Sequence, residues 1–465
     1  YKSGRVSYQA NYGETRRTVN ICCAWFDENT VAQSDHNALQ TFKEAHKVFV
    51  NKRIQFLQTL PPICRAKILP IEKAERKKEK AIQTLSQAIY HGIHELHEAH
   101  AKLHPDGDKK VSIGLVRMAN IQPLVAVVKD FTSHTPLSES RLHLCVYHSR
   151  YPLILRSEIE RSLDNILNRS DPQAIWGLPE IKQVLDKHTE QNQIFVIFST
   201  SVAEVGRDHD YDWVIAEPSS MRSIIQVAGR IQRHRRQECI QPNLYILNQN
   251  YKALMGEEVV FQRPGFETKE WKLKDKKIEN ILRPEQYEVI NSIPRIKERE
   301  SLEPNANFVD LEHASLRRGL FQAQGSINDR CASFWWQNSA TWCHELQRRT
   351  RFRESFEQEE FLFFAEDEDD ELIIHKVADD GKLIPMQNLF NIETTLSTAP
   401  GIQFWFDFKL KEVLLDIKED TCEREGRDIT MAEICRKFAN FEIEKDRDNV
   451  LPWNYSPQLG VYRKL

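Results

Sequence analysis

Apolar residues recur at three-to-four-residue spacing in two long stretches near the start of the chain. The first, residues 39–60, ends at Pro61-Pro62, and the second, residues 82–103, ends near Pro105-Asp106-Gly107. This spacing places the apolar side chains on one face of a helix, and proline cannot continue one. The pattern therefore predicts two helices that form a long helical hairpin. We assign them, with a strand over 19–26 (VNICCAWF), to a connector region over residues 1–110.

The pattern changes at residue 111 to short continuous apolar runs that alternate with helical periodicity. Strands are predicted over 111–119, 143–150, 194–200, 212–218 and 243–248. Helices are predicted over 123–131, 153–167 and 221–232, and a further helix is predicted to begin with Asp171 as N-cap and Pro172 at its first position. Unalternating apolar strands that alternate with helices indicate a parallel sheet with helices on both faces. Residues 111–250 are therefore predicted to form a RecA-like α/β unit.

The rest of the chain lacks this regular alternation. Residues 251–320 are polar, charged and punctuated by proline, which is typical of a linker. Residues 321–465 mix short strands with a helix near 431–444, and we assign them to an α+β accessory domain. Within it, the run Phe334-Trp335-Trp336 is interpreted as core packing, with base stacking as the alternative.

Composition narrows the class of protein. Apolar residues make up 40% and charged residues 28% of the chain, which are globular values, and no apolar run approaches the roughly 20 residues of a membrane span. The polar start at Tyr1 does not resemble a signal peptide. None of the nine cysteines forms a CxxC pair, which argues against a zinc ribbon and a disulfide scaffold. We expect a cytoplasmic protein with reduced thiols and no membrane partner.

Charge is unevenly distributed, although the net charge is only −4. Residues 222–236 are basic, and a local basic groove is enough for a nucleic-acid binder. The acidic run EDEDDE at 366–371 is interpreted as a solvated surface.

Unusual residues gather where three of the predicted strands end. One strand ends in His148-Ser149-Arg150, the next runs into STSVAEVGRD at 199–208, and a third precedes the helix with QVAGRIQR at 226–233. Ligands of open parallel sheets sit at the carboxyl ends of the strands. Arg230 and Arg233, three residues apart, are predicted to share a helix face with Gln226 one turn earlier. Gly229 leaves room beside the arginines, whose permanent charge suits a phosphate chain.

These segments resemble known helicase motifs. QVAGRIQR is similar to motif VI of superfamily 2 helicases, Q-x-x-G-R-x-x-R, and STSVAEVGRD is similar to motif V at Thr200, Ala203, Glu204, Gly206 and Asp208. The strand ending in VYHSR resembles motif IV. The longer runs at 117–124, 147–160 and 205–230 resemble the CRISPR-associated helicase–nuclease of subtype I-F in particular. The likeness is dense over 111–250 and weak beyond 320.

The resemblance implies a second motor lobe that closes on ATP and Mg²⁺ held mainly by a first lobe. Arg230 and Arg233 would be arginine fingers, with Gln226 and Gly229 near the γ-phosphate. Gly206 and Asp208 would link the nucleotide state to DNA. The expected contacts to single-stranded DNA are Ser199, Thr200, His148, Arg150 and Asn120. An arginine finger is typically worth about 10³–10⁵ in rate.

The resemblance also implies what the whole protein does. Such an enzyme would be recruited by a guide-RNA surveillance complex, would move 3′ to 5′ along single-stranded DNA, and would unwind and degrade invading DNA. Its nuclease domain would hold divalent metal ions outside this chain. The implied further partners are the CRISPR adaptation integrase and phage anti-CRISPR proteins.

Several parts of such an enzyme are missing from the sequence. No G-x-x-x-x-G-K-S/T phosphate loop and no clustered His-Asp nuclease motif is present, and the chain begins with Tyr1 rather than Met. We therefore expect those parts on preceding sequence, and we expect this chain alone neither to hydrolyse ATP nor to cut DNA. Asp27-Glu28 resembles a metal-site strand end but is interpreted as an ordinary one.

Other interpretations remain open. Motifs V and VI also fit another superfamily 2 DNA or RNA helicase or translocase. A non-catalytic binding module with a RecA-like fold is the alternative from a different class. Five histidines at 91, 94, 97, 100 and 104 lie near one helix face, but HELHEAH is not HExxH. We therefore predict no metal site in this chain.

Overall fold

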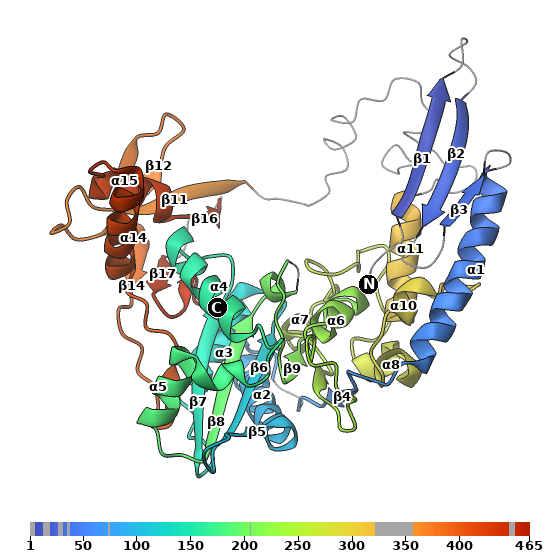
Figure 1. Ribbon diagram of the computed structural model, residues 1–465, viewed down its shortest axis with the longest axis horizontal. Helices are drawn as coiled ribbons and strands as arrows, with labels where there is room; N and C mark the ends of the chain where they lie inside the picture. The colour runs from blue at the N-terminus through green and yellow to red at the C-terminus, as the bar shows by residue number, and fades with distance from the viewer. Residues whose placement is uncertain are drawn as a thin grey trace.

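The structure is a computed structural model that describes residues 5–12, 19–26, 31–34, 38–72, 75–204, 206–320, 357–445 and 452–465. Side chains are described from residue 47 onward, apart from residue 387. Three parts follow one another in Figure 1: a small N-terminal sheet with a long helix, a central sheet with its helices, and a small C-terminal α+β region. Asp27-Glu28 and the aromatic run at 334–336 lie outside the described residues.

The central sheet confirms the predicted parallel α/β unit. Its strands follow the order β15-β7-β8-β6-β9-β10-β4, and every neighbouring pair on this path is parallel. The strands are β4 (Ala66–Leu69), β6 (Lys110–Arg117), β7 (Ser140–Tyr147), β8 (Asn192–Ser199), β9 (Trp213–Ala216), β10 (Leu244–Leu247) and β15 (Ile402–Phe404). The two-residue strand β5 (Lys102–Leu103) runs antiparallel beside β6.

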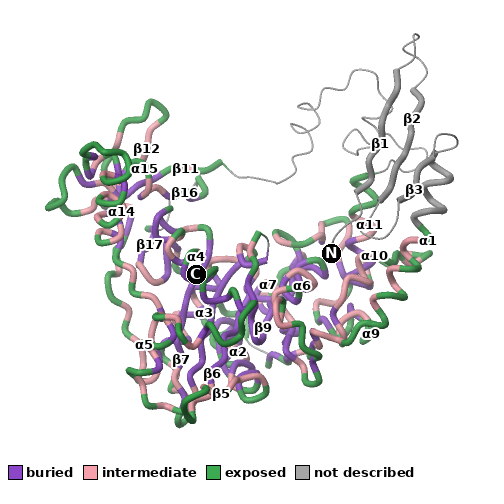
Figure 2. The backbone as a smooth tube through the Cα atoms, in the orientation of Figure 1, coloured by how far each residue is buried: buried purple, intermediate pink, exposed green. Residues whose placement is uncertain are grey.

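Helices cover both faces of this sheet, and Figure 2 shows buried residues concentrated between them. One face packs against α2 and α3, and the other packs against α4, α5 and α6. These helices are α2 (Lys78–His100), α3 (Ile121–Phe131), α4 (Leu153–Ile166), α5 (Pro179–Lys187) and α6 (Met221–Ala228). Successive residues of a strand point to opposite faces. Leu144 of β7 accordingly joins the α2–α3 core, and Cys145 joins the other.

All five strands predicted over 111–250 are present, but the parallel path of the sheet also includes two strands from outside that range. β4 pairs with β10, and β15 pairs with β7. Each new strand has only three or four residues. Such short strands carry almost no local pattern, so their pairing depends on partners far away in the chain. The domain boundaries at 110 and 320 remain a prediction.

Two predictions about helices outside the motif VI segment are wrong. The first concerns the helical hairpin: β4 lies between α1 (Ala38–Thr59) and α2, so the two helices join different neighbours. Helix α1 contacts β2, β3 and α10, whereas α2 contacts α3, β6 and β9. The second concerns Asp171, whose carboxylate accepts a bond from the Gln173 amide in a turn. The short 3₁₀ helix η1 (Ala174–Gly177) follows that turn, and α5 starts only at Pro179, which takes the first-turn position expected for proline.

The N-terminal sheet contains more strands than the one we predicted. β1 (Arg5–Tyr12), β2 (Val19–Phe26) and β3 (Val31–Ser34) form an antiparallel sheet in that order. The predicted strand over 19–26 is confirmed as β2.

Residues 251–320 are packed rather than merely linking. They form α7 (Tyr251–Leu254), α8 (Ile278–Ile281), α9 (Pro284–Tyr287), α10 (Ile293–Ile296) and α11 (Phe308–Leu320). Phe261, Phe308 and Leu311 are fully or almost fully buried in the same core as α6. The Glu312 carboxylate accepts bonds from the Arg222 amide at 3.2 and 3.3 Å, which ties α11 to the start of α6.

The described residues of the C-terminal region form two further small sheets. One has the order β13-β12-β11-β16 and the other β14-β17-β18. Their strands are β11 (Gln358–Phe364), β12 (Ile373–Val377), β13 (Leu383–Pro385), β14 (Phe390–Ile392), β16 (Asn440–Glu444), β17 (Trp453–Ser456) and β18 (Gly460–Tyr462). The helices described between residues 357 and 465 are α14 (Leu410–Glu425), α15 (Met431–Phe438) and the 3₁₀ helix η3 (Gln387–Leu389). The mixed α+β class of this region is confirmed. The acidic run at 366–371 lies in the connection between β11 and β12, and all six of its residues are exposed.

No helix in the described part of the chain is both long and apolar enough to cross a membrane.

Gly114 in β6 is predicted to be essential for packing of the sheet. A Cβ atom built on Gly114 would lie 2.3 Å from ring atoms of Trp213, which is itself fully buried on β9. Overpacking a core typically costs about 1–3 kcal/mol. We expect Gly114→Ala to lower the free energy of unfolding by roughly 3 kcal/mol in urea denaturation, because the buried indole, whose Nε1 donates to the Ser112 hydroxyl at 3.0 Å, cannot easily move away. The control is Gly107→Ala, whose added Cβ would meet no atom within 4 Å. Equal stability of the two variants would contradict this account.

Candidate nucleotide- and DNA-facing site

The segments that resemble motifs V and VI lie side by side at the carboxyl edge of the central sheet. Motif V follows β8 through the 3₁₀ helix η2 (Ser201–Ala203), and motif VI follows β9 through α6. Gly206 has a φ of +76°, a left-handed conformation that glycine adopts without a Cβ penalty. The chain can therefore turn sharply between η2 and Asp208.

The prediction that Arg230 and Arg233 share a helix face is wrong. Helix α6 ends at Ala228, with Gly229 as its C-cap, so both arginines lie in the turn that follows. The turn is held by a parallel bridge between Tyr211 and Ile231. The Tyr211 amide donates to the Arg230 carbonyl at 2.8 Å, and the Gln232 amide donates to the Tyr211 carbonyl at 3.0 Å. We name residues 229–236 the arginine turn.

Contacts of the arginine turn join motif VI to motif V. A terminal nitrogen of Arg230 donates to the Glu204 carbonyl at 2.8 Å. Arg233 forms an ion pair with Asp208 and donates to the Gly229 carbonyl at 3.5 Å. The Arg233 guanidinium beside Asp208 holds the pKa of that carboxyl below its usual value. Arg233 is 42% exposed and Asp208 is 71% exposed, so a bound anion could replace this carboxylate.

The other two residues of motif VI also lie near the surface. Gln226 is half-buried near the end of α6, and Gly229 is exposed. A Cβ on Gly229 would meet only the carbonyls of Gln226 and Ile225, at 3.4 Å or more. Packing within this chain therefore does not require glycine at position 229. This is consistent with the prediction that Gly229 leaves room beside the arginines.

Glu204 occupies the centre of a buried polar network that sequence reasoning did not assign to the site. Its Oε1 accepts from Arg117 Nε at 2.5 Å and from the Ser223 hydroxyl at 2.6 Å. Arg117 also donates to the Glu217 carbonyl at 2.9 Å. The network links β6, motif V and α6 within the core. In the sequence, Glu204 belongs to the motif V match, and Arg117 and Glu217 each stand at the end of an apolar run, but no local pattern indicates that they lie together.

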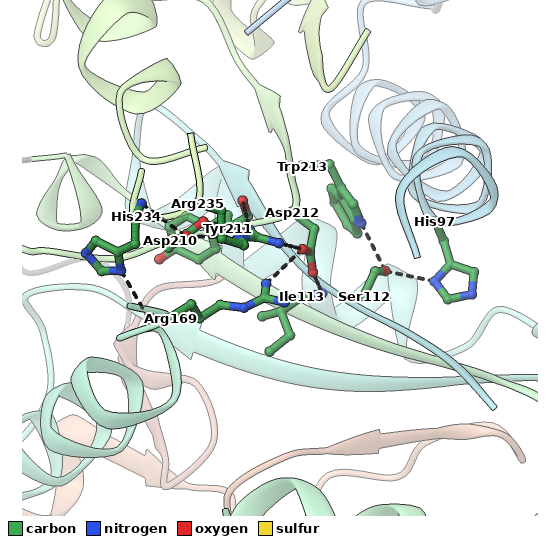
Figure 3. A network of polar contacts seen from close by, with 10 residues as sticks. All are labelled: His97, Ser112, Ile113, Arg169, Asp210, Tyr211, Asp212, Trp213, His234 and Arg235. Carbon is green, nitrogen blue, oxygen red and sulfur yellow. Dashed lines mark hydrogen bonds and ion pairs between the residues drawn. The ribbon is translucent and has the colours of Figure 1, made fainter. Parts of the chain in front are cut away.

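A second network, drawn in Figure 3, surrounds Arg235. Its guanidinium is 1% exposed and pairs with Asp210 and Asp212, both at 2.6 Å. Asp212 also pairs with Arg169 at 2.8 Å. We predicted Arg235 only as part of a basic cluster. The sequence spacing indicates this pairing. Acidic residues stand at every second position, 208, 210 and 212, and arginines stand at 233 and 235, so two extended segments side by side would pair them.

The residues predicted to contact DNA at β8 and β6 differ in exposure. Ser199 is fully buried, and its hydroxyl donates to the Thr200 carbonyl at 3.2 Å, which argues against its predicted contact with a phosphate. Thr200 follows it with 7% exposure. Asn120 is half-buried and precedes α3, and its side chain makes no capping bond. Thr200 and Asn120 follow neighbouring strands, because β6 and β8 pair directly.

The motif IV residues face the C-terminal region instead of solvent. His148 is fully buried, and its Nε2 bonds the Leu459 carbonyl at 2.8 Å. Burial lowers the pKa of His148 to about 3. Arg150 donates to Gln122 at 3.0 Å, and its guanidinium lies over the Trp453 ring, 5.4 Å from the centroid. The structure therefore argues against direct DNA contact by His148 and gives both residues a role in docking β17 and β18.

The histidine-rich helix face serves packing. His97 on α2 is 3% exposed and bonds the Ser112 hydroxyl at 2.8 Å and Asn192 at 3.2 Å. His100 bonds the Pro242 carbonyl at 2.9 Å. Among the side chains that the structure describes, no three His, Cys, Asp or Glu residues are grouped so that they could hold a metal ion.

Comparisons with known proteins point to one family. The sequence pattern described as "CRISPR-associated nuclease/helicase Cas3, C-terminal" matches residues 110–236. The CRISPR-associated nuclease/helicase Cas3 subtype I-F/YPEST of Pectobacterium atrosepticum is 39% identical over 389 residues, which is 82% of this chain and 35% of that protein. Its counterpart from Pseudomonas aeruginosa is 36% identical over 463 residues, which is 99% of this chain and 42% of that protein.

A solved structure of T. fusca Cas3 with ATP is 18% identical, covers 40% of this chain and 18% of that one, and gives a TM-score of 0.26, too low to carry an argument. The chain thus spans less than half the length of the two relatives, and the match to them covers most of this chain. The chain belongs to the Cas3 family of CRISPR-associated nuclease/helicases, subtype I-F/YPEST, and corresponds to a C-terminal portion of it.

Proposed function

We propose that this chain is the second motor lobe of an ATP-driven single-stranded DNA translocase, within a helicase–nuclease that unwinds and degrades invading DNA. The observation that carries this proposal is the arginine turn. It sets two guanidiniums at the carboxyl edge of a parallel sheet, beside the segment that ends in Gly206 and Asp208. Ligands of parallel sheets bind at that edge.

The chemistry of the turn fits the phosphates of ATP. Arginine is a permanently charged residue type, and its guanidinium matches phosphate geometry. The Nε of Arg230 is buried, and none of the described residues supplies it with a hydrogen-bond partner. This donor therefore remains available for a further acceptor, as does Arg233 once it leaves Asp208. Both could stabilise the charge that spreads over the γ-phosphoryl oxygens during transfer.

Other components of the motor lie outside this chain. ATP and Mg²⁺ would be held mainly by a first lobe with a phosphate loop, and Mg²⁺ would neutralise phosphate charge there. The nuclease metal ions would likewise belong to another domain. Gln226 and Gly229 would approach the γ-phosphate, and Gly206 and Asp208 would couple the nucleotide state to the DNA. Thr200, Asn120 and Arg150 remain the candidates for DNA contact in this lobe.

The family points to a set of partners. A guide-RNA surveillance complex would deliver the enzyme to invading DNA in the cytoplasm. The adaptation integrase and phage anti-CRISPR proteins are further proposed partners. All of these come from the family and not from a surface of this chain.

Directional unwinding tests the proposal. A full-length protein that carries this chain is incubated with ATP and a short duplex bearing either a 3′ or a 5′ single-stranded tail. We expect ATP-dependent strand separation of the 3′-tailed duplex at least about tenfold faster than of the 5′-tailed one, and none with a non-hydrolysable ATP analogue. DNA binding without ATP-dependent separation of either duplex would favour a binding module. Equal rates on both tails would contradict the proposed direction.

A further inference from the structure

The side chain of Arg235 is buried, and its described hydrogen bonds all go to residues 210–212. Nε and one Nη donate to the two carboxylate oxygens of Asp210, at 3.0 and 2.6 Å. The other Nη donates to Asp212 at 2.6 Å, and the first also reaches the Tyr211 carbonyl at 3.0 Å. Figure 3 shows the guanidinium lying among these three residues. Arg235 therefore makes a planar fork that lysine cannot copy.

The contacts of Arg235 fasten one end of the arginine turn, and backbone bonds fasten the other. The Tyr211 amide bonds the Arg230 carbonyl, and the same residue's carbonyl bonds Arg235. The His234 amide donates to Asp210 at 3.2 Å. The finger residues Arg230 and Arg233 thus lie on a short span of chain attached on both sides to residues 210–212.

The backbone of the turn requires such attachment. Gln232 and Arg236 both have a φ of +49°, in the left-handed region that costs a non-glycine residue about 1–3 kcal/mol. Such conformations persist only where the surroundings determine them. One of the two strained residues lies between the fingers, so relaxation there would redirect both side chains.

The anchor of the turn is tied to the central sheet. Asp212 accepts a bond from the Ile113 amide at 2.8 Å, inside the sheet, and pairs with Arg169. The two carboxylates and two guanidiniums balance in charge, which a buried network needs. Asp212 is therefore bonded to β6 and directly precedes β9, and the Asp210 amide bonds the Leu167 carbonyl at 3.1 Å.

We propose that Arg235 is a positioning residue for the motor reaction: through Asp210 and Asp212 it holds the arginine turn so that Arg230 and Arg233 point at the nucleotide. This inference rests on the proposed function of the two fingers. Arg235 itself touches neither ATP nor DNA.

Steady-state ATP hydrolysis with single-stranded DNA, in a full-length protein that carries this chain, tests the proposal. Arg235→Lys keeps the charge and removes the fork. We expect kcat to fall by about 10- to 100-fold, as for small misplacements of catalytic groups, with KM for ATP changed less than about threefold. Asp210→Asn, which keeps Arg235 and loses one charge, should lower kcat in the same direction. If Arg235→Lys does not fold, Asp210→Asn still tests the proposal.

The matched control is Arg169→Lys. Arg169 is also buried and also pairs with Asp212. Its backbone amide donates to His234 Nδ1 at 3.1 Å, a bond that the substitution keeps, and none of the described hydrogen bonds joins its side chain to the arginine turn. We expect a similar loss of thermal stability and a kcat within about threefold of the wild-type value. If Arg169→Lys lowers kcat as much as Arg235→Lys does, Arg235 is only a stabilising residue and the proposal is overturned.

A double-mutant comparison separates this proposal from the proposed function. In a background of Arg230→Ala with Arg233→Ala, we expect Arg235→Lys to change single-turnover hydrolysis less than about twofold, since no finger remains to misplace. An undiminished effect in that background would overturn the positioning role and leave the fingers in place. If the background variant itself hydrolyses ATP like the wild type, the finger function fails and the positioning role fails with it.

Discussion

Arg233→Ala should lower the kcat of DNA-stimulated ATP hydrolysis by about 10³-fold or more while leaving the fold intact. Loss of an arginine finger typically removes a factor of about 10³–10⁵ in rate, or at least roughly 4 kcal/mol of transition-state stabilisation. The stability should change little, because the Arg233–Asp208 pair is largely exposed and such pairs contribute about 0–1 kcal/mol. Binding of ATP should persist, since charge on the γ-phosphoryl oxygens grows mainly in the transition state.

Arg233 allows a cleaner experiment than Arg230. Arg230→Ala also removes the bond to the Glu204 carbonyl and leaves a half-buried gap, so part of its effect would be structural. The matched control is Arg222→Ala, an exposed arginine on the neighbouring helix α6. The measurement is kcat and KM at saturating single-stranded DNA, with ATP binding followed separately by a fluorescent analogue. A drop of less than about tenfold, or an equal drop in Arg222→Ala, would count against the finger assignment.

Acidification from pH 7 to pH 5 should destabilise the central sheet strongly through two buried histidines. His143 and His148 lie on and directly after β7, and both are fully buried. Burial lowers the pKa of each to about 3. His143 bonds Gln193 at 2.7 Å and Gln403 of β15 at 3.0 Å, and His148 bonds the Leu459 carbonyl. Each ring therefore stays neutral in the folded protein.

The sign and size of the effect follow from linkage. An unfolded histidine has a pKa near 6.5, so below that pH the unfolded chain binds a proton that the folded chain excludes. The full free energy of unfolding is therefore retained above pH 6.5, and it decreases as the pH falls from 6.5 toward the pKa of the folded state. Between pH 7 and pH 5 each histidine should remove about 2 kcal/mol, and the pair about 4 kcal/mol.

Thermal unfolding at pH 7 and pH 5 measures this effect. We expect His143→Gln with His148→Gln to be less stable than the wild type at pH 7 but to lose much less stability on acidification. His91→Gln, at an exposed position of α2, is the control and should keep the wild-type dependence. An unchanged dependence in the double variant would show that other groups cause the acid sensitivity. Because both rings hold C-terminal segments, proteolysis within 390–465 should also increase first at pH 5.

The hydrophobic periodicity and the motifs in the sequence predicted the central sheet, the position of the candidate site and the family. Five parallel strands were predictable, because continuous apolar runs between helical stretches are a local signal of a sheet buried on both faces. The neighbourhood of motifs V and VI was also predictable, because the carboxyl ends of parallel strands lie at one edge. The likeness to superfamily 2 helicases followed from QVAGRIQR and STSVAEVGRD, and the likeness to subtype I-F followed from the longer runs at 117–124, 147–160 and 205–230.

Tertiary structure decided what depends on partners distant in the chain. β4 and β15 have three or four residues each and exist as strands because β10 and β7 offer free edges. The arginines of motif VI lie beyond the end of α6 because the bonds of Tyr211 and Arg235 hold residues 229–236 beside residues 208–212. His148 is buried because residues 452–462 fold back over the end of β7. The sequence by itself determined the residue types at the site and the elements near them, since these are local. Only the packed structure decided which charges are buried and paired and which reach the surface, because burial and pairing are properties of several segments together.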